Sequence, residues 1–158
     1  MPGTSDISLI ARKQFVLDLD GIHGEAHWTR VRENGLRLAK ITGANPKVVE
    51  LFALLHDSKR ASEGRDPEHG LRAAGFARTL AGKAFSLKPE DLVDLLEACR
   101  HHSDGLMEGS VTVLTCWDAD RLDLGRAGIL PDPDHLCTDA ARNPAIMKWA
   151  YRRSIHRG

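Results

Sequence analysis

The sequence predicts an all-α fold, and three observations support this prediction. Apolar residues recur at the helical spacing of i, i+3, i+4 and i+7 in several segments. The alternation of β-branched and polar residues that is typical of strands is nearly absent. Residues that start and stop helices flank the same segments. The 158 residues, 42% of them hydrophobic, are enough for one compact core, so we expect a single domain over residues 1–158.

The first long helix is expected at about residues 26–41. Trp28 and Leu38 lie at positions that face inward, and His27 lies on the adjoining face. Gly43 follows the last turn, where a glycine commonly ends a helix. The helix would therefore place His27 next to a buried apolar stripe.

The next helix is expected to begin at Pro46, with Asn45 as its N-cap. Its apolar stripe leads into the letters ALLHDSKR, which place His56 and Asp57 side by side at the end of the helix. Both groups are costly to bury without partners. Partners for them are therefore expected elsewhere in the chain.

Two later segments also bring histidines toward the interior. In DPEHGLRAAGFARTLAG, Asp66 is the expected N-cap, so His69 falls in the first helical turn. The positive end of a helix disfavours imidazolium there and favours the neutral form that can bind a metal. In KPEDLVDLLEACRHHSDG, His102 extends the inward stripe and His101 lies beside it.

The segment TVLTCWDADRLDLGR is expected to form a helix on which Asp120 points inward more clearly than Asp118. After Gly125 the sequence is rich in turn residues, and we expect two short helices with a basic C-terminal end. We interpret that end, residues 151–158, as a solvated tail.

The polar residues that are expected to face inward come from five helical segments. One buried histidine is commonly explained by a hydrogen bond inside a core, but several beside acids are not. A divalent cation would offset the cost of burying the carboxylates and would bind neutral imidazoles. Nitrogen and oxygen ligands without thiolates suit Mn, Fe, Zn, Co or Ni better than Ca or Mg. The inward polar residues are His27, His56, Asp57, His69, His101, His102 and Asp120.

Three motifs occur in order: H-x-x-R-V from His27, LLHD ending at Asp57, and DADRLD from Asp118. This order resembles the HD-domain superfamily of metal-dependent phosphohydrolases over about residues 21–126, with residues 127–158 as a C-terminal helical extension. The resemblance implies a compact helical bundle of about six to eight helices. It also implies four protein ligands for a first metal, which are His27, His56, Asp57 and Asp120.

The extra histidines resemble those of superfamily members that bind two metals. The letters RHHSDG are similar to the double-histidine segment of the HD-GYP phosphodiesterases, although the GYP motif is absent and cyclic-dinucleotide specificity is not implied. We expect His69 and one or both of His101 and His102 to hold a second metal or to bind phosphate. The alternative is that the two adjacent histidines only cap the end of a helix. One or two metal ions are therefore expected.

The expected chemistry is attack on phosphorus by water that is activated at the metal. By resemblance, Asp57 orients that water as well as binding the metal. Arg30 and Lys59 are candidates to neutralise charge on the phosphoryl oxygens, or are ordinary solvated charges. Arg121 is a candidate to pair with one of the aspartates that flank it and to steady the last ligand helix.

The predicted function is cleavage of a phosphomonoester or phosphodiester bond in a small phosphorylated substrate, with nucleotides among the candidates. The alternatives are an HD-fold di-iron oxygenase and a non-catalytic metal-binding regulatory module. The complete ligand set counts against the module, because a degenerate module is expected to have lost a ligand.

Charge and cysteine content limit the partners and the location. The 22 basic and 22 acidic residues balance, so we expect neither a nucleic-acid polymer nor a membrane as a partner. Three cysteines without C-x-x-C spacing argue against a disulfide framework and a thiolate zinc site. Because the sequence has no leader-like apolar segment, the expected location is the cytoplasm. A homodimer is compatible with the sequence.

Overall fold

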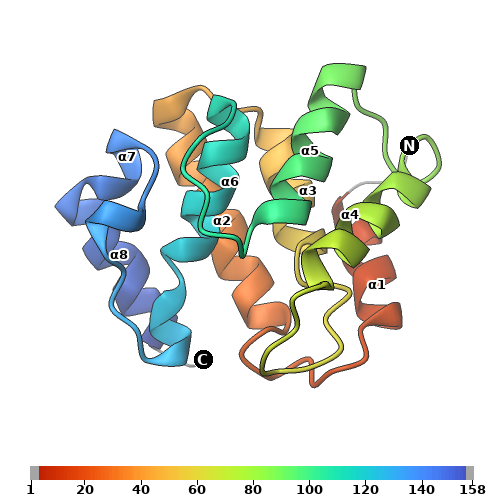
Figure 1. Ribbon diagram of the computed structural model, residues 1–158, viewed down its shortest axis with the longest axis horizontal. Coiled ribbons are helices and arrows are strands. Elements are labelled where there is room, and N and C mark those ends of the chain that lie inside the picture. The colour runs from red at the N-terminus through yellow and green to blue at the C-terminus, as the bar shows by residue number, and fades with distance from the viewer. Residues whose placement is uncertain (1–3, 156–158) are drawn as a thin grey trace.

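The computed structural model describes residues 4–155 and is all-α, as predicted (Figure 1). These residues form eight α-helices and two short 3-10 helices, η1 and η2, and contain no β-strand apart from one isolated β-bridge. The expected bundle of about six to eight helices is therefore confirmed. No helix in this part of the chain combines the length and the apolar composition needed to cross a membrane. The elements are α1 (Thr4–Gln14), α2 (Glu25–Thr42), α3 (Pro46–Leu55), α4 (His69–Leu80), α5 (Pro89–His101), α6 (Val111–Arg121), η1 (Leu124–Ala127), η2 (Pro133–His135), α7 (Asp139–Arg142) and α8 (Pro144–Ile155).

α3 is the central helix of the bundle and contacts α1, α2, α4, α5 and α6 (Figure 1). The Asn45 side chain accepts a hydrogen bond from a backbone N–H of the first turn, and Pro46 is the first helical residue, as predicted. All residues of α3 from 51 to 55 are buried, and each large apolar side chain buried contributes about 1.5–3 kcal/mol. The burial of this end of α3 carries the next two residues, His56 and Asp57, into the interior.

α2 packs along α3 and α6 and matches the predicted range to within one residue at each end. It ends at Gly43, whose φ of 82° lies in the left-handed region that glycine adopts without strain. Its buried face includes Trp28, Leu38 and His27. The predicted inward stripe beside His27 is therefore confirmed.

α4 begins at His69, and Asp66 is not its N-cap, contrary to the prediction. The Asp66 carboxylate instead accepts hydrogen bonds from the Ala61 backbone N–H at 2.7 Å and from Arg72 Nη2 at 2.7 and 2.8 Å. These bonds close the loop between α3 and α4. His69 still lies in the first turn of α4, as predicted.

α7 and α8 are the two short helices that were predicted after Gly125, and both pack on α2. Leu38 of α2 and Ile146 of α8 share a second buried apolar cluster. Residues 151–155 of the predicted tail belong to α8, whereas residues 156–158 lie outside the described part of the chain. The division of the chain into a motif core and a C-terminal extension stays a prediction.

Candidate metal centre

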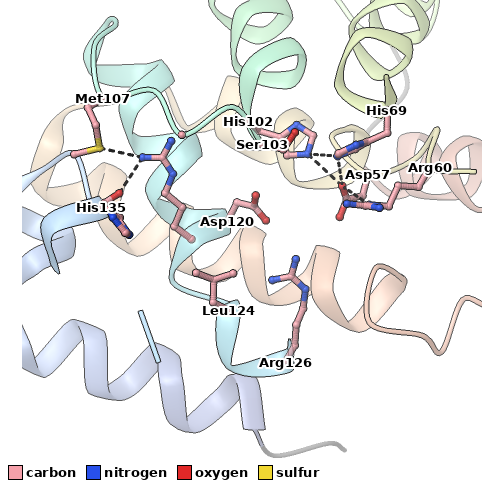
Figure 2. A pocket seen from close by; sticks show the side chains of 12 residues that line it. Asp57, Arg60, His69, His102, Ser103, Met107, Asp120, Leu124, Arg126 and His135 are labelled. Atoms are coloured by element: carbon pink, nitrogen blue, oxygen red, sulfur yellow. Dashed lines mark hydrogen bonds and ion pairs between the residues drawn. The ribbon is translucent and has the colours of Figure 1, made fainter. Parts of the chain in front are cut away.

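Six polar side chains from α2, α6 and the ends of three other helices converge at one point in the interior. Four are histidines and two are aspartates, and all but Asp120 are buried. Figure 2 shows four of the six beside a cavity. Their ligand-type atoms form three overlapping groups, in each of which the atoms lie within 4.8 Å of one another. The six residues are His27, His56, Asp57, His69, His102 and Asp120.

The same hydrogen-bond pattern orients all four histidines. In each, Nδ1 lies within hydrogen-bond distance of an accepting oxygen, so Nδ1 carries the proton and Nε2 keeps a lone pair that faces the cluster. An outer partner of this kind fixes the tautomer of a metal-binding histidine. The four contacts are His27 Nδ1 to Asp123 Oδ2 (2.6 Å), His56 Nδ1 to Phe52 O (3.0 Å), His69 Nδ1 to Asp66 O (2.5 Å) and His102 Nδ1 to Cys99 O (2.7 Å).

The acceptor atoms of the cluster require a positive charge between them. His27 Nε2 and His56 Nε2 lie 3.1 Å apart, and they lie 3.2 and 3.4 Å from Asp120 Oδ1. Asp120 Oδ1 is buried and has no hydrogen-bond partner within residues 4–155. Lone pairs and carboxylates at these distances repel each other unless a cation or a proton joins them. The residues therefore fit a divalent metal ion.

The pKa values of the cluster residues also indicate that the acidic side chains attract positive charge. Burial opposes the ionisation of Asp57 and Asp120, but the surrounding histidines outweigh it and hold the pKa of both carboxyls well below the usual range. Burial and the nearby Arg126 lower the pKa of His27, but three carboxylates outweigh them and raise that pKa to about 9. A proton on His27 Nε2 and a metal ion would compete for the same lone pair.

Asp57 lies between two groups of ligand atoms. Its Oδ2 lies 3.3 Å from His27 Nε2 and 3.5 Å from His56 Nε2. Its Oδ1 lies 3.4 Å from His69 Nε2 and 3.3 Å from His102 Nε2. The arrangement is therefore compatible with one metal ion or with two ions that share the Asp57 carboxylate.

His101 is not brought to the cluster, although its neighbour His102 is. The His101 Nδ1 pairs with Asp104 Oδ2 at 2.7 Å, and the side chain is 35% exposed. It lines a separate groove that is formed by α4 and α5. Successive residues in a helical conformation point about 100° apart, and the end of α5 directs His102 to the cluster and His101 to this groove. The structure therefore leaves His102, and not His101, within reach of a second metal or of phosphate.

Lys59 does not line the cavity beside the cluster, so of its two expected roles the contact with phosphate is not supported. Its Nζ lies 4.4 Å from the centroid of the Phe76 ring. The chain turns after α3, and Arg60 lines the cavity instead. Arg60 Nε lies 3.6 Å from Asp57 Oδ1. The basic residue at the cluster is thus Arg60, which the sequence analysis did not single out.

Arg30 and Asp123 support the cluster from outside. Arg30 Nε donates to Asp123 Oδ1 at 2.7 Å, and Asp123 is fully buried. Because the other Asp123 oxygen accepts from His27, Arg30 lies behind a ligand and not at this cavity, so its candidate role at the phosphoryl oxygens is not supported. Sequence reasoning did not place Asp123 in the site, although it follows Asp120 by one helical turn in DADRLD.

Arg121 and Asp118 fix loops, and the hydrogen bonds of Arg121 go neither to Asp118 nor to Asp123, the two candidate partners. The Arg121 guanidinium donates to Leu106 O at 2.7 Å and to His135 O at 2.9 Å. The buried Asp118 carboxylate accepts a hydrogen bond from the Cys137 backbone N–H at 2.7 Å. The two residues therefore hold in place the loops that precede α6 and α7.

A cavity of about 430 Å³ opens beside the cluster (Figure 2). This volume suits a small ligand. Side chains of the cluster line the cavity together with Arg60, Arg121 and Arg126, and Met107 and Leu124 add apolar surface to it. No spacing pattern indicates Arg126, because this residue belongs to a short 3-10 helix after the last motif.

Comparison with known proteins gives one structural similarity. No protein-family model matches the chain, and no curated protein matches it. Among solved structures, the chain is similar to the crystal structure of a predicted HD superfamily hydrolase from an uncultured Thermotogales bacterium. The TM-score is 0.73 and the sequence identity is 29%, and the match covers 96% of this chain and 86% of that chain.

Proposed function

The chain has the HD-domain fold, and from this premise we propose that it is a metal-dependent phosphohydrolase that cleaves a phosphate ester of a small substrate. The solved structure to which it is similar is a predicted hydrolase of the HD superfamily. The observation that carries the proposal is the convergence of four histidine Nε2 atoms on two aspartates beside a cavity that contains arginines. A site of this composition suits a substrate that is both metal-bound and anionic.

Two sets of residues would hold the metal. His27, His56, Asp57 and Asp120 form the first set, and Asp57 with His69 and His102 forms the second. Mixed nitrogen and oxygen ligands without thiolate favour Mn, Fe, Co, Ni or Zn over Mg. A bound divalent cation supplies water of lowered pKa near neutral pH and polarises a phosphoryl oxygen.

In the proposed reaction, a bond forms between a water oxygen and phosphorus while the phosphorus–oxygen bond of the ester breaks. The leaving alcohol takes a proton that water supplies, so a monoester gives phosphate and an alcohol, and a diester gives a monoester and an alcohol. The protein holds its ligand atoms ready for this reaction, because each Nδ1 hydrogen bond fixes a ring before the substrate arrives. Arg60 and Arg126 bring positive charge to the cavity, where the phosphoryl oxygens would lie.

The proposal is tested by a screen of phosphomonoesters and phosphodiesters with protein that has been loaded in turn with Mn, Co, Ni, Zn and Mg. We expect hydrolysis with at least one of the transition metals and a loss of about 100-fold or more in the His56→Ala variant. Asp104→Asn is the matched control, because Asp104 pairs with His101 outside the cluster. Its activity is expected to stay within about twofold of the wild type.

Two outcomes would contradict the proposal and favour the alternative functions. Tightly held iron at two ions per chain, with oxygen consumption and no ester hydrolysis, would favour a di-iron oxygenase. Stoichiometric metal without turnover of any phosphate ester would favour a non-catalytic metal-binding module.

A further inference from the structure

We propose that the substrate is a phosphomonoester and not a phosphodiester, because Arg60 and Arg126 form a subsite for a terminal phosphoryl group beside the cluster. This inference rests on the proposed function and narrows its substrate class. It is carried by the orientation of the two guanidinium groups, by the charge of the cavity and by the lining of its remaining part.

Arg126 is held in position by the backbone. Its side chain is only 11% exposed. Its Nε donates to Ile22 O at 2.9 Å, and its Nη1 donates to Asp123 O at 2.9 Å. In Figure 2 the guanidinium is directed into the cavity, toward the side where Asp120 and Asp57 lie. The ordering of this side chain is therefore complete before a ligand binds, which favours a ligand-binding role.

Arg60 is held in a similar way on the other side of the cluster. Its Nη1 donates to Ser62 O at 3.0 Å and to Gly64 O at 2.9 Å. Its buried Nε faces Asp57 Oδ1 at 3.6 Å, which is beyond hydrogen-bond distance, and has no hydrogen-bond partner within the described residues. Buried N–H donors are rarely left unpaired in native proteins, and an oxygen of a bound ligand would provide the missing acceptor.

The charge of the cavity favours a dianion over a monoanion. Three arginines, Arg60, Arg121 and Arg126, line the cavity with the two carboxylates of Asp57 and Asp120, so one positive charge is in excess before each divalent metal adds two more. A terminal phosphoryl group carries about −1.5 to −2 at pH 7. A phosphodiester carries a single negative charge, which would leave positive charge uncompensated in a partly enclosed site.

The lining of the cavity leaves room for one organic group. Met107 and Leu124 provide apolar surface in the lining, and the Sδ atom of Met107 lies 3.4 Å from Arg121 Nη1. Arg121 fixes the loop that carries Met107, because it donates to Leu106 O at 2.7 Å. A diester would need to place its second organic group near Arg60 and Arg126, where charged guanidinium groups line the cavity. A monoester places its alcohol against the apolar part and its phosphoryl oxygens at the arginines.

The first test measures the binding of inorganic phosphate to metal-loaded protein by calorimetry. We expect Arg126→Gln and Arg60→Gln each to weaken binding by about 10- to 100-fold, because a charge-assisted hydrogen bond is lost. Arg126→Lys keeps the charge but not the backbone contacts of the planar guanidinium, so it is expected to lose less affinity for phosphate than Arg126→Gln. Arg100→Gln is the matched control on the exposed side of α5 and should bind within about twofold of the wild type. Metal content and thermal melting of each variant show that it is loaded and folded.

The second test compares kcat/KM for p-nitrophenyl phosphate and bis(p-nitrophenyl) phosphate. We expect the wild type to favour the monoester by about tenfold or more, and Arg126→Gln to narrow this ratio. If folded Arg126→Gln and Arg126→Lys both bind phosphate within twofold of the wild type, or if the diester is the better substrate, the inference is overturned. If neither ester is hydrolysed, the proposed function fails, and the phosphate-binding series still decides whether the two arginines form an anion subsite.

Discussion

His27 Nδ1 and Asp123 Oδ2 lie 2.6 Å apart, and both side chains are fully buried. The contact reaches across 96 residues of sequence and joins α2 to the segment that follows α6. Arg30 holds the other oxygen of Asp123. The ring of His27 is therefore fixed with its Nε2 facing the cluster, and the fold itself sets the direction of one ligand atom.

The Asp123→Asn variant is expected to weaken metal binding by about 10- to 100-fold. The amide has one acceptor oxygen, so it cannot accept from both His27 and Arg30, and its NH2 group faces one of the two donors. Competition with a chelator measures the metal dissociation constant of each protein. Asp139→Asn is the control, since that carboxylate is exposed. An unchanged constant in Asp123→Asn would show that the buried contact does not orient the ligand.

Gly70 and Gly75 of α4 provide a matched pair of variants. A Cβ at Gly70 would lie 2.4 Å from Arg100 O and 2.9 Å from Cys99 O, whereas a Cβ at Gly75 would meet nothing within 4 Å. We expect Gly70→Ala to lower the free energy of unfolding by about 1–3 kcal/mol, because α4 must move away from α5. Gly75→Ala is expected to raise it by up to about 1 kcal/mol through helix propensity. Urea denaturation measures the free energy of unfolding of both variants. Equal changes in the two variants would contradict the close packing of α4 against α5.

Cys137 is expected to react slowly with iodoacetamide near pH 8. Burial and the neighbouring Asp118 raise the pKa of its thiol to about 11, so the reactive thiolate is scarce below that pH. The pKa of this thiol is higher in the folded protein than in the unfolded chain. The free energy of unfolding therefore falls as the pH rises above the thiol pKa of the unfolded chain, and this group does not change it at lower pH. Mass spectrometry follows labelling from pH 7 to 10 in buffer and in urea. Equal rates at pH 8 in both solvents would be inconsistent with a protected thiol.

The helices of the central bundle could be predicted from the sequence because their signals are local. Asn45 and Gly43 mark a helix start and a helix end through their own backbone and side-chain chemistry, and both do so in the structure. Asp66 is the exception, since its carboxylate finds better donors in Ala61 and Arg72 than at the start of α4.

The ligand-type residues of the site could also be identified from their inward positions, and the structure brings six of the seven together. The sequence could not choose between His101 and His102, because that choice depends on the exact turn at which α5 ends. It also could not choose between Lys59 and Arg60, because the chain leaves the helix at that point and helical spacing no longer sets the direction. The orientation of Arg126 depends in part on the Ile22 carbonyl, which is 104 residues away in sequence, so no local pattern indicates it.

The central claim is that the six side chains form a metal site, and metal content tests it most directly. Three proteins are purified without chelator: the wild type, Asp57→Ala and Asp139→Ala, which is an exposed control. Inductively coupled plasma mass spectrometry measures the metal content of each. Because Asp57 contacts both groups of ligand atoms, we expect about one or two transition-metal ions per chain in the wild type and the control, and less than about a tenth of that in folded Asp57→Ala. Wild-type metal content in Asp57→Ala, or no bound metal in the wild type after addition of Mn, Co, Ni or Zn, would contradict the claim.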